Sequence, residues 1–196
     1  MARRKSSRKT SGNGNLPGNA SARKNEPRSK PPRVSSLKVA KTADGTWELV
    51  HPRCALARRD DLDEVQQMLA AGENEIAQDE LRWLLSDCHD FVDAHKLLGD
   101  LALAANDVRL ARGHYGYAYQ LCLAALPGAG QTPSLPFRHA ANQAFFEAGR
   151  GAALCLMKMG QRRMAREVID RLLQLDSSDP LQLRAGLNVA GPCRDP

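Results

Sequence analysis

Histidine and cysteine offer this chain its most versatile chemistry, and their spacing limits what they can do. The five histidines are scattered along the sequence, and the five cysteines form no CxxC pair. Cys88-His89 is the one place where two such side chains are adjacent. Because zinc sites use ligands paired at short intervals, the sequence predicts no metal site. A site at Cys88-His89 is the minor alternative.

The cysteines follow a different regularity. Cys54, Cys88 and Cys122 are evenly spaced along the sequence. Equivalent positions in stacked helical units should lie about 8–10 Å apart, beyond the ~7 Å between Cα atoms that a disulfide tolerates. We therefore expect Cys54, Cys88, Cys122 and Cys155 to be small buried thiols in a reducing compartment.

Sequence motifs of catalysis are missing. Gly128-Ala129-Gly130 lacks the flanking strand, the helix start and the lysine of a phosphate-binding loop. No serine stands in a GxSxG motif. The carboxylates between Asp60 and Asp107 are spread along predicted solvated helix faces, so their spacing implies no acid–base pair. The sequence predicts a non-enzyme with no catalytic residue and no cofactor.

Helical periodicity is strongest between Val92 and Ala125. Two amphipathic segments flank the polar turn Asn106-Asp107, with apolar or small residues at three- and four-residue steps. These residues are Leu97, Leu98, Gly99, Leu101 and Ala102, then Ala111, Tyr115, Ala118 and Leu121. Because a helical hairpin of this size cannot bury its apolar face alone, we expect further copies.

Copies are found on both sides. A backward step equal to the cysteine spacing matches Gly72 to the turn residue Asn106, Ala77 to Ala111 and Leu81 to Tyr115. A longer forward step, from Gly99 to Ala153, also matches Gly160, Ala165 and Ile169 to their counterparts. The additional residues that lengthen this step contain Pro127-Gly128 and Pro133, which indicates an insertion between two units.

This period, with its small residue in the first helix and its alanine and aromatic in the second, resembles the tetratricopeptide repeat family over about Arg58 to Pro180. The resemblance implies an all-α solenoid of about three stacked antiparallel helical hairpins. Its repeats fall at 58–91, 92–125 and 146–179, with an insertion at 126–145 and a C-terminal cap at 180–196. Its packing positions are Gly72, Ala77, Gly99, Ala111, Tyr115, Ala118, Ala153, Gly160 and Ala165. An ordinary helical bundle is the alternative.

Composition separates a tail from a domain. Residues 1–42 hold twelve Lys/Arg and the single acid Glu26, a net charge of +11, whereas residues 43–196 carry −5. With few large apolar residues, the segment 1–42 cannot offset the entropy of ordering, so we expect a disordered basic tail. Residues 43–196 should form the folded domain.

Two tryptophans are assigned to the apolar interior of this domain. Trp47, with Leu49 and Val50, is expected to cover the open end of the first repeat, because terminal repeats need an atypical cover. Trp83 is expected in the core, and an aromatic that faces a partner is the alternative.

The sequence gives no indication of membrane insertion or secretion. No apolar run approaches the length of a membrane span, and no apolar core follows Arg3-Arg4-Lys5 as in a secretory signal. A cytoplasmic protein without a membrane partner is expected.

The family resemblance also implies a binding surface, because first helices of such repeats line a concave groove for an extended peptide or a partner helix. The groove residues on this mapping are Leu62, Gln66, Leu69, Lys96, Asp100, Leu103, Arg150, Leu154, Met157 and Lys158. Some members grip a C-terminal carboxylate with a Lys/Asn/Arg clamp. The corresponding positions here hold Leu62, Gln66, Leu97, Glu147 and Gly151. That ligand class is therefore not expected.

Charge indicates what kind of partner would approach. Residues 60–107 hold thirteen acids against Arg82 and Lys96, a net charge of −11, whereas residues 108–196 carry +5. A strongly acidic face steers basic partners, among them the protein's own tail. The tail alternatively predicts nonspecific binding of nucleic acid, without base stacking because no aromatics interleave its basic residues.

The leading interpretation is a protein–protein interaction module, a scaffold or adaptor. A nucleic-acid-associated protein that uses its tail for affinity and its repeats for recruitment is the alternative. The sequence assigns no oligomeric state.

Overall fold

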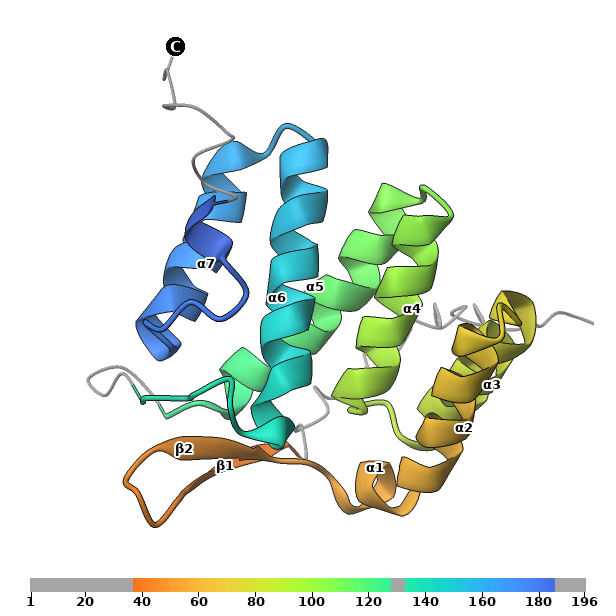
Figure 1. Ribbon diagram of the computed structural model, residues 1–196, viewed down its shortest axis with the longest axis horizontal. Helices are drawn as coiled ribbons and strands as arrows, with labels where there is room; N and C mark the ends of the chain where they lie inside the picture. The colour runs from red at the N-terminus through yellow and green to blue at the C-terminus, as the bar shows by residue number, and fades with distance from the viewer. Residues whose placement is uncertain (1–36, 128–132, 186–196) are drawn as a thin grey trace, which may run out of the picture. The chain divides into compact units, whose positions relative to one another are not determined.

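The computed structural model describes residues 37–127 and 133–185, which are mostly helical with one small two-stranded sheet (Figure 1). The elements are β1 (Lys38–Lys41), β2 (Trp47–Val50), α1 (Arg53–Ala57), α2 (Arg59–Ala70), α3 (Asn74–Asp87), α4 (Val92–Ala104), α5 (Val108–Ala125), α6 (Ala140–Lys158) and α7 (Arg162–Leu175). The predicted predominance of helix is confirmed. The all-α expectation missed the sheet.

The sheet is an antiparallel hairpin that pairs Lys38 with Val50 and Lys41 with Trp47. Its turn uses Gly45 at φ +82°, a conformation that glycine adopts without steric cost. Strand β1 falls inside the segment assigned to the tail, so the boundary at residue 42 is wrong. The segment is ordered because Leu37 and Val39 pack into the core. Residues 1–36 of the predicted tail lie outside the described residues.

One buried amide fixes the hairpin to α6. Asn142, fully buried, accepts a hydrogen bond from the backbone N–H of Leu49 at 2.9 Å. Its Nδ2 donates to the carbonyl oxygens of Trp47, at 3.1 Å, and Pro136, at 2.9 Å. The prediction that the segment around Trp47 covers the open end of the first repeat is therefore wrong. It packs against α6, and this contact satisfies strand groups that would otherwise be left unpaired.

The helices pair in chain order, α2 with α3, α4 with α5 and α6 with α7, as antiparallel neighbours (Figure 1). Each pair turns through a residue with positive φ: Gly72 at +82°, Asn106 at +61° and Gly160 at +76°. Glycine and asparagine are the residues that tolerate this left-handed conformation after a helix. These three residues are the ones that the sequence comparison placed at the turns.

Small residues let the helices approach closely. Ala77, Ala111, Ala118, Ala153 and Ala165 are all buried. Between α4 and α6, the ring of Tyr115 lies against two glycines. A Cβ atom placed on Gly99 or on Gly151 would come within 2.6 Å of that ring. The small residues expected at packing positions therefore lie where side chains of neighbouring helices meet.

The buried apolar side chains form two clusters. One joins α1, α2 and α3 to the start of α4, and includes Leu81, Leu84 and Phe91. The other joins α4 to α7 and the hairpin, and includes Phe145, Phe146 and Leu172. Trp83 belongs to neither cluster. Its side chain is 45% exposed and stacks under the guanidinium of Arg58 at 4.4 Å, so the prediction of a core residue is wrong.

The cysteines only partly follow the sequence prediction. Cys122 and Cys155 are buried free thiols, as expected. Cys54 and Cys88 instead form a disulfide, with Cα atoms 5.6 Å apart. The prediction failed because Cys54 lies on the short helix α1 and Cys88 caps α3, so the two positions are not structurally equivalent. This disulfide removes the argument for a reducing compartment, and cytoplasmic residence stays a prediction.

Candidate functional site

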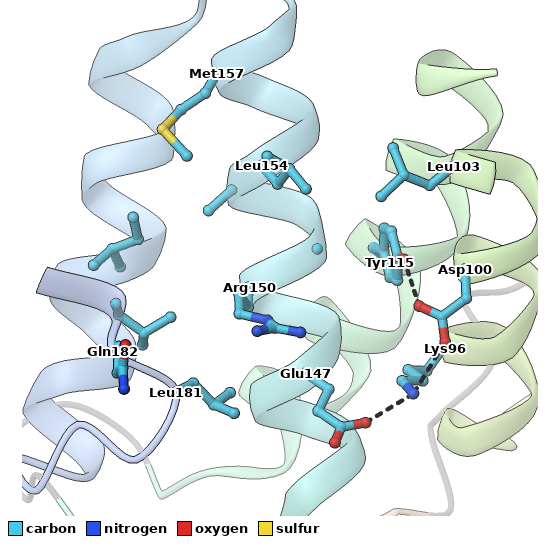
Figure 2. Close-up of a pocket in the computed structure, with 14 residues that line it drawn as sticks. Lys96, Asp100, Leu103, Tyr115, Glu147, Arg150, Leu154, Met157, Leu181 and Gln182 are labelled. Atoms are coloured by element: carbon cyan, nitrogen blue, oxygen red, sulfur yellow. Dashed lines mark hydrogen bonds and ion pairs between the residues drawn. The ribbon is translucent and has the colours of Figure 1, made fainter. Parts of the chain in front are cut away.

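A cleft of about 540 Å³ opens between α4, α6 and the chain segment that follows α7 (Figure 2). Successive turns of α4 contribute Lys96, Asp100 and Leu103, and α6 contributes Glu147, Arg150, Leu154 and Met157. Tyr115 reaches the cleft from α5. The cleft therefore depends on how three helices are spaced, and Tyr115 between its two glycines sets part of that spacing.

Six of the ten predicted groove residues line this cleft. They are Lys96, Asp100, Leu103, Arg150, Leu154 and Met157. Gln66 and Leu62 line a second hollow, of about 300 Å³, which shares Lys96 and Glu147 with the first. Leu62 is 1% exposed, so it belongs to the core and offers almost no surface to a ligand. Leu69 and Lys158 line neither hollow.

An ion-pair network joins α4 to α6 across the cleft (Figure 2). The Nζ of Lys96 lies 3.0 Å from Asp100 Oδ2 and 2.9 Å from Glu147 Oε2. Burial opposes the charge on Lys96, but its hydrogen bonds to the two carboxylates outweigh burial and raise its pKa. The network holds the two helices in register where the two hollows meet.

Tyr115 adds a neutral donor to this network. Its hydroxyl donates to Asp100 Oδ1 at 2.6 Å. Burial, together with this hydrogen bond, raises the pKa of Tyr115, so the phenol stays protonated at neutral pH. With Lys96 on one oxygen and Tyr115 on the other, both carboxylate oxygens of Asp100 have a partner.

Arg150 is the cation that this network leaves out. In the described part of the chain, its guanidinium has neither an ion pair nor a hydrogen bond, and its side chain extends from α6 into the cleft (Figure 2). Farther along α6, Leu154 is 38% exposed and lies near Met157, opposite Leu103 of α4. The cleft thus combines an unpaired cation with an apolar end.

The segment after α7 supplies the remaining wall through Leu181, Gln182 and Leu183. The carboxylate of Asp179 accepts hydrogen bonds from the backbone N–H groups of Leu183, at 2.6 Å, and Arg184, at 3.1 Å. Leu183 is thereby held in the core at 5% exposure. The start of the predicted C-terminal cap therefore packs onto the helices, whereas residues 186–196 lie outside the described residues.

Two histidines that the sequence reading treated as scattered lie together between α4 and α5. The Nδ1 atoms of His95 and His114 are 3.4 Å apart, and His95 Nε2 lies 3.0 Å from the carbonyl oxygen of His89. Burial lowers the pKa of His95 to about 4 and also lowers the pKa of His114. The interval between the two histidines in the sequence was the available signal, and it is not a recognised ligand spacing.

Metal-ligating side chains do not converge in the parts of the chain that the structure describes: no group of three or more His, Cys, Asp or Glu could hold an ion. Among the helices of residues 37–127 and 133–185, none combines the length and the hydropathy needed to cross a membrane.

No protein-family model matches the chain, and no curated protein matches it significantly. What the cleft does must therefore be inferred from its own geometry.

Proposed function

We propose that this protein is a non-enzymatic interaction module, a scaffold or adaptor, that holds an extended peptide in a groove along α4 and α6. The observation that carries the proposal is the cleft of about 540 Å³, to which residues far apart in the sequence contribute. Clefts of this volume are typical of specific ligand sites. The second hollow continues past the Lys96–Glu147 pair, which suits a ligand longer than a single side chain.

The same proposal includes the architecture, an α-solenoid of the tetratricopeptide repeat type. Its support is the recurrence of one packing scheme. The turn residues with positive φ fall at equivalent places in the three hairpins, and buried alanines recur at the helix crossings. In such an array the first helices, here α2, α4 and α6, line one face. Residues from these three helices line the two hollows.

Selection from a displayed library of nine-residue random peptides tests the proposal with the full chain as bait. Synthetic copies of the selected peptides are then measured by fluorescence polarisation against two variants. Leu154→Asp should weaken binding by about tenfold or more, because a carboxylate replaces an apolar contact in the cleft. The matched control is Met164→Asp, because Met164 is an exposed residue of α7 outside the cleft, 46% exposed.

The control should bind like the parent protein. A selection that yields no peptide sensitive to Leu154→Asp would contradict the proposed groove. Thermal melts of both variants verify that the fold is intact, and both substitutions fall on exposed side chains.

A further inference from the structure

We propose that the cleft selects peptides in which an acidic side chain stands two residues from a large aliphatic one. The carboxylate would pair with Arg150, and the aliphatic side chain would contact Leu154 and Met157. This inference rests on the proposed function and specifies the ligand of the same cleft.

Charged side chains within the cleft are not all paired. Lys96 is paired with both Asp100 and Glu147, and Tyr115 donates to the other oxygen of Asp100. Arg150 is left without a partner among the described residues. A ligand that covers an unpaired guanidinium must desolvate it at a cost, whereas a carboxylate on the ligand offsets that cost with charge-assisted hydrogen bonds.

The spacing of residues along α6 matches the spacing of side chains in an extended peptide. Arg150 and Leu154 are four residues apart on this helix, a rise of about 6 Å. In an extended peptide, side chains two residues apart lie on the same side at about 6.6 Å. An acidic residue and an aliphatic residue separated by one position therefore reach Arg150 and Leu154 together. Adjacent residues would point to opposite sides.

The layout of the cleft does not suit a chain terminus as the acidic group. The cleft continues from Arg150 to the Lys96–Glu147 pair, where the lysine already has the carboxylate of Glu147 as its partner. The second hollow continues from that point with Gln66 and Gln143, so a peptide backbone can proceed along it. An internal acidic side chain fits these conditions better than a terminal carboxylate.

The net charge of the surrounding part of the chain favours the same ligand. Residues 108–185 hold ten bases and five acids, so the part of the molecule that carries Arg150 is positive. The carboxylates of residues 60–107, which led to the expectation of a basic partner, contribute only Asp100 to this cleft, and Asp100 is already paired with Lys96. An acidic ligand would be steered toward α6 and α7.

Sequencing of the peptide pool selected above, repeated with Arg150→Glu as bait, tests the motif. The wild-type pool should be enriched in Asp or Glu two positions from Leu, Ile or Met. The Arg150→Glu pool should replace that acid by Lys or Arg. In fluorescence polarisation, changing the acid to lysine should weaken binding to the wild type by about tenfold and strengthen binding to Arg150→Glu.

Arg166→Glu is the matched control, because Arg166 is an exposed arginine of α7 that does not line the cleft. It should keep the wild-type preference, which separates local pairing from a general loss of positive charge. A pool that depends on Leu154 but shows no acidic preference, or one unchanged by Arg150→Glu, would overturn this inference and leave the proposed groove standing. A pool that does not depend on Leu154 would overturn the proposed function itself.

Discussion

Tyr115 links the packing of the helices to the floor of the cleft. Its ring fills the space that Gly99 and Gly151 leave open, and its hydroxyl holds Asp100 in place. A change at either glycine therefore affects both the spacing of α4 and α6 and the polar network between them. The sequence predicted that Gly99 and Tyr115 are packing positions. Gly151 was considered only as one of the positions at which the carboxylate clamp of the resembled family is not kept.

Gly99→Ala should lower the free energy of unfolding by about 1–3 kcal/mol, because its methyl group overlaps the Tyr115 ring in a filled core. Gly113→Ala is the control in α5, where an added Cβ meets no atom within 4 Å. That substitution should raise stability by up to about 1 kcal/mol through helix propensity. Urea denaturation measures both. Equal effects of the two substitutions would contradict the tight contact at Tyr115.

Acid should weaken the contact of α4 with α5 through His95. Because burial lowers the pKa of His95 from 6.5 to about 4, the unfolded chain binds this proton more readily than the folded one between those values. The contribution of His95 to the free energy of unfolding is therefore fully present above pH 6.5, and it is lost as the pH falls toward 4. Between pH 7 and pH 4.5 the loss from this residue should be about 2 kcal/mol.

Urea denaturation at the two pH values, compared with His95→Gln, isolates this contribution from that of the carboxylates. The variant should show a smaller loss on acidification than the wild type. An identical loss in both proteins would rule out His95 as the source.

The environments of some side chains could be predicted from the sequence, and those of others could not. Repeated alanines and turn glycines were predictable because helical packing imposes the same local demand in each hairpin. Asn142, Leu62 and Trp83 were not, since their environments depend on which distant segment covers them. Asn142 meets a strand that lies 93 positions away. Arg150 was assigned to the groove, but its lack of a partner could be read only from the structure.

Among the elements, α1 carries a covalent link to another helix. It is only five residues long, and its disulfide joins Cys54 to Cys88 at the end of α3. The closed loop has a sequence separation of 34 residues, for which the chain-entropy account gives about 4 kcal/mol. Removing the bond should therefore destabilise the part of the fold formed by α1, α2 and α3.

Cys54→Ser should lower the free energy of unfolding by about 2–4 kcal/mol under oxidising conditions. A reducing agent should lower wild-type stability by a similar amount and leave Cys54→Ser unchanged. Guanidinium denaturation with and without the reductant provides the comparison. Insensitivity of the wild type to reduction would show that this disulfide does not contribute to stability.

Short elements were the least predictable from the sequence. Helices α3, α5 and α7 end at, or up to four residues before, the predicted ends of their repeats at residues 91, 125 and 179, because their apolar periodicity is long and regular. Strand β1 carries lysine at both ends and has no such pattern. It forms because it pairs with β2 and packs against the core, and a local sequence pattern does not encode such tertiary contacts.

For the whole molecule, the division of the core into two clusters predicts uneven stability. The cluster of α1, α2 and α3 contains one buried aromatic residue, Phe91, whereas the other packs Tyr115, Tyr119, Phe145 and Phe146. Amide hydrogen exchange should therefore show α2 and α3 opening at lower free energy than α5 and α6. Reduction of the disulfide should increase the difference. Uniform protection across both clusters would mean that the fold opens as one unit.

The attachment of the hairpin to Asn142 also has a consequence for biosynthesis. A ribosome completes the hairpin about 90 residues before it makes the amide that β2 binds, a delay of roughly 5–20 s at ordinary elongation rates. During that interval the emerging strands carry backbone groups that their final partner has yet to satisfy. Chaperone contacts with the nascent chain should therefore concentrate on this early hairpin and decline once α6 leaves the exit tunnel.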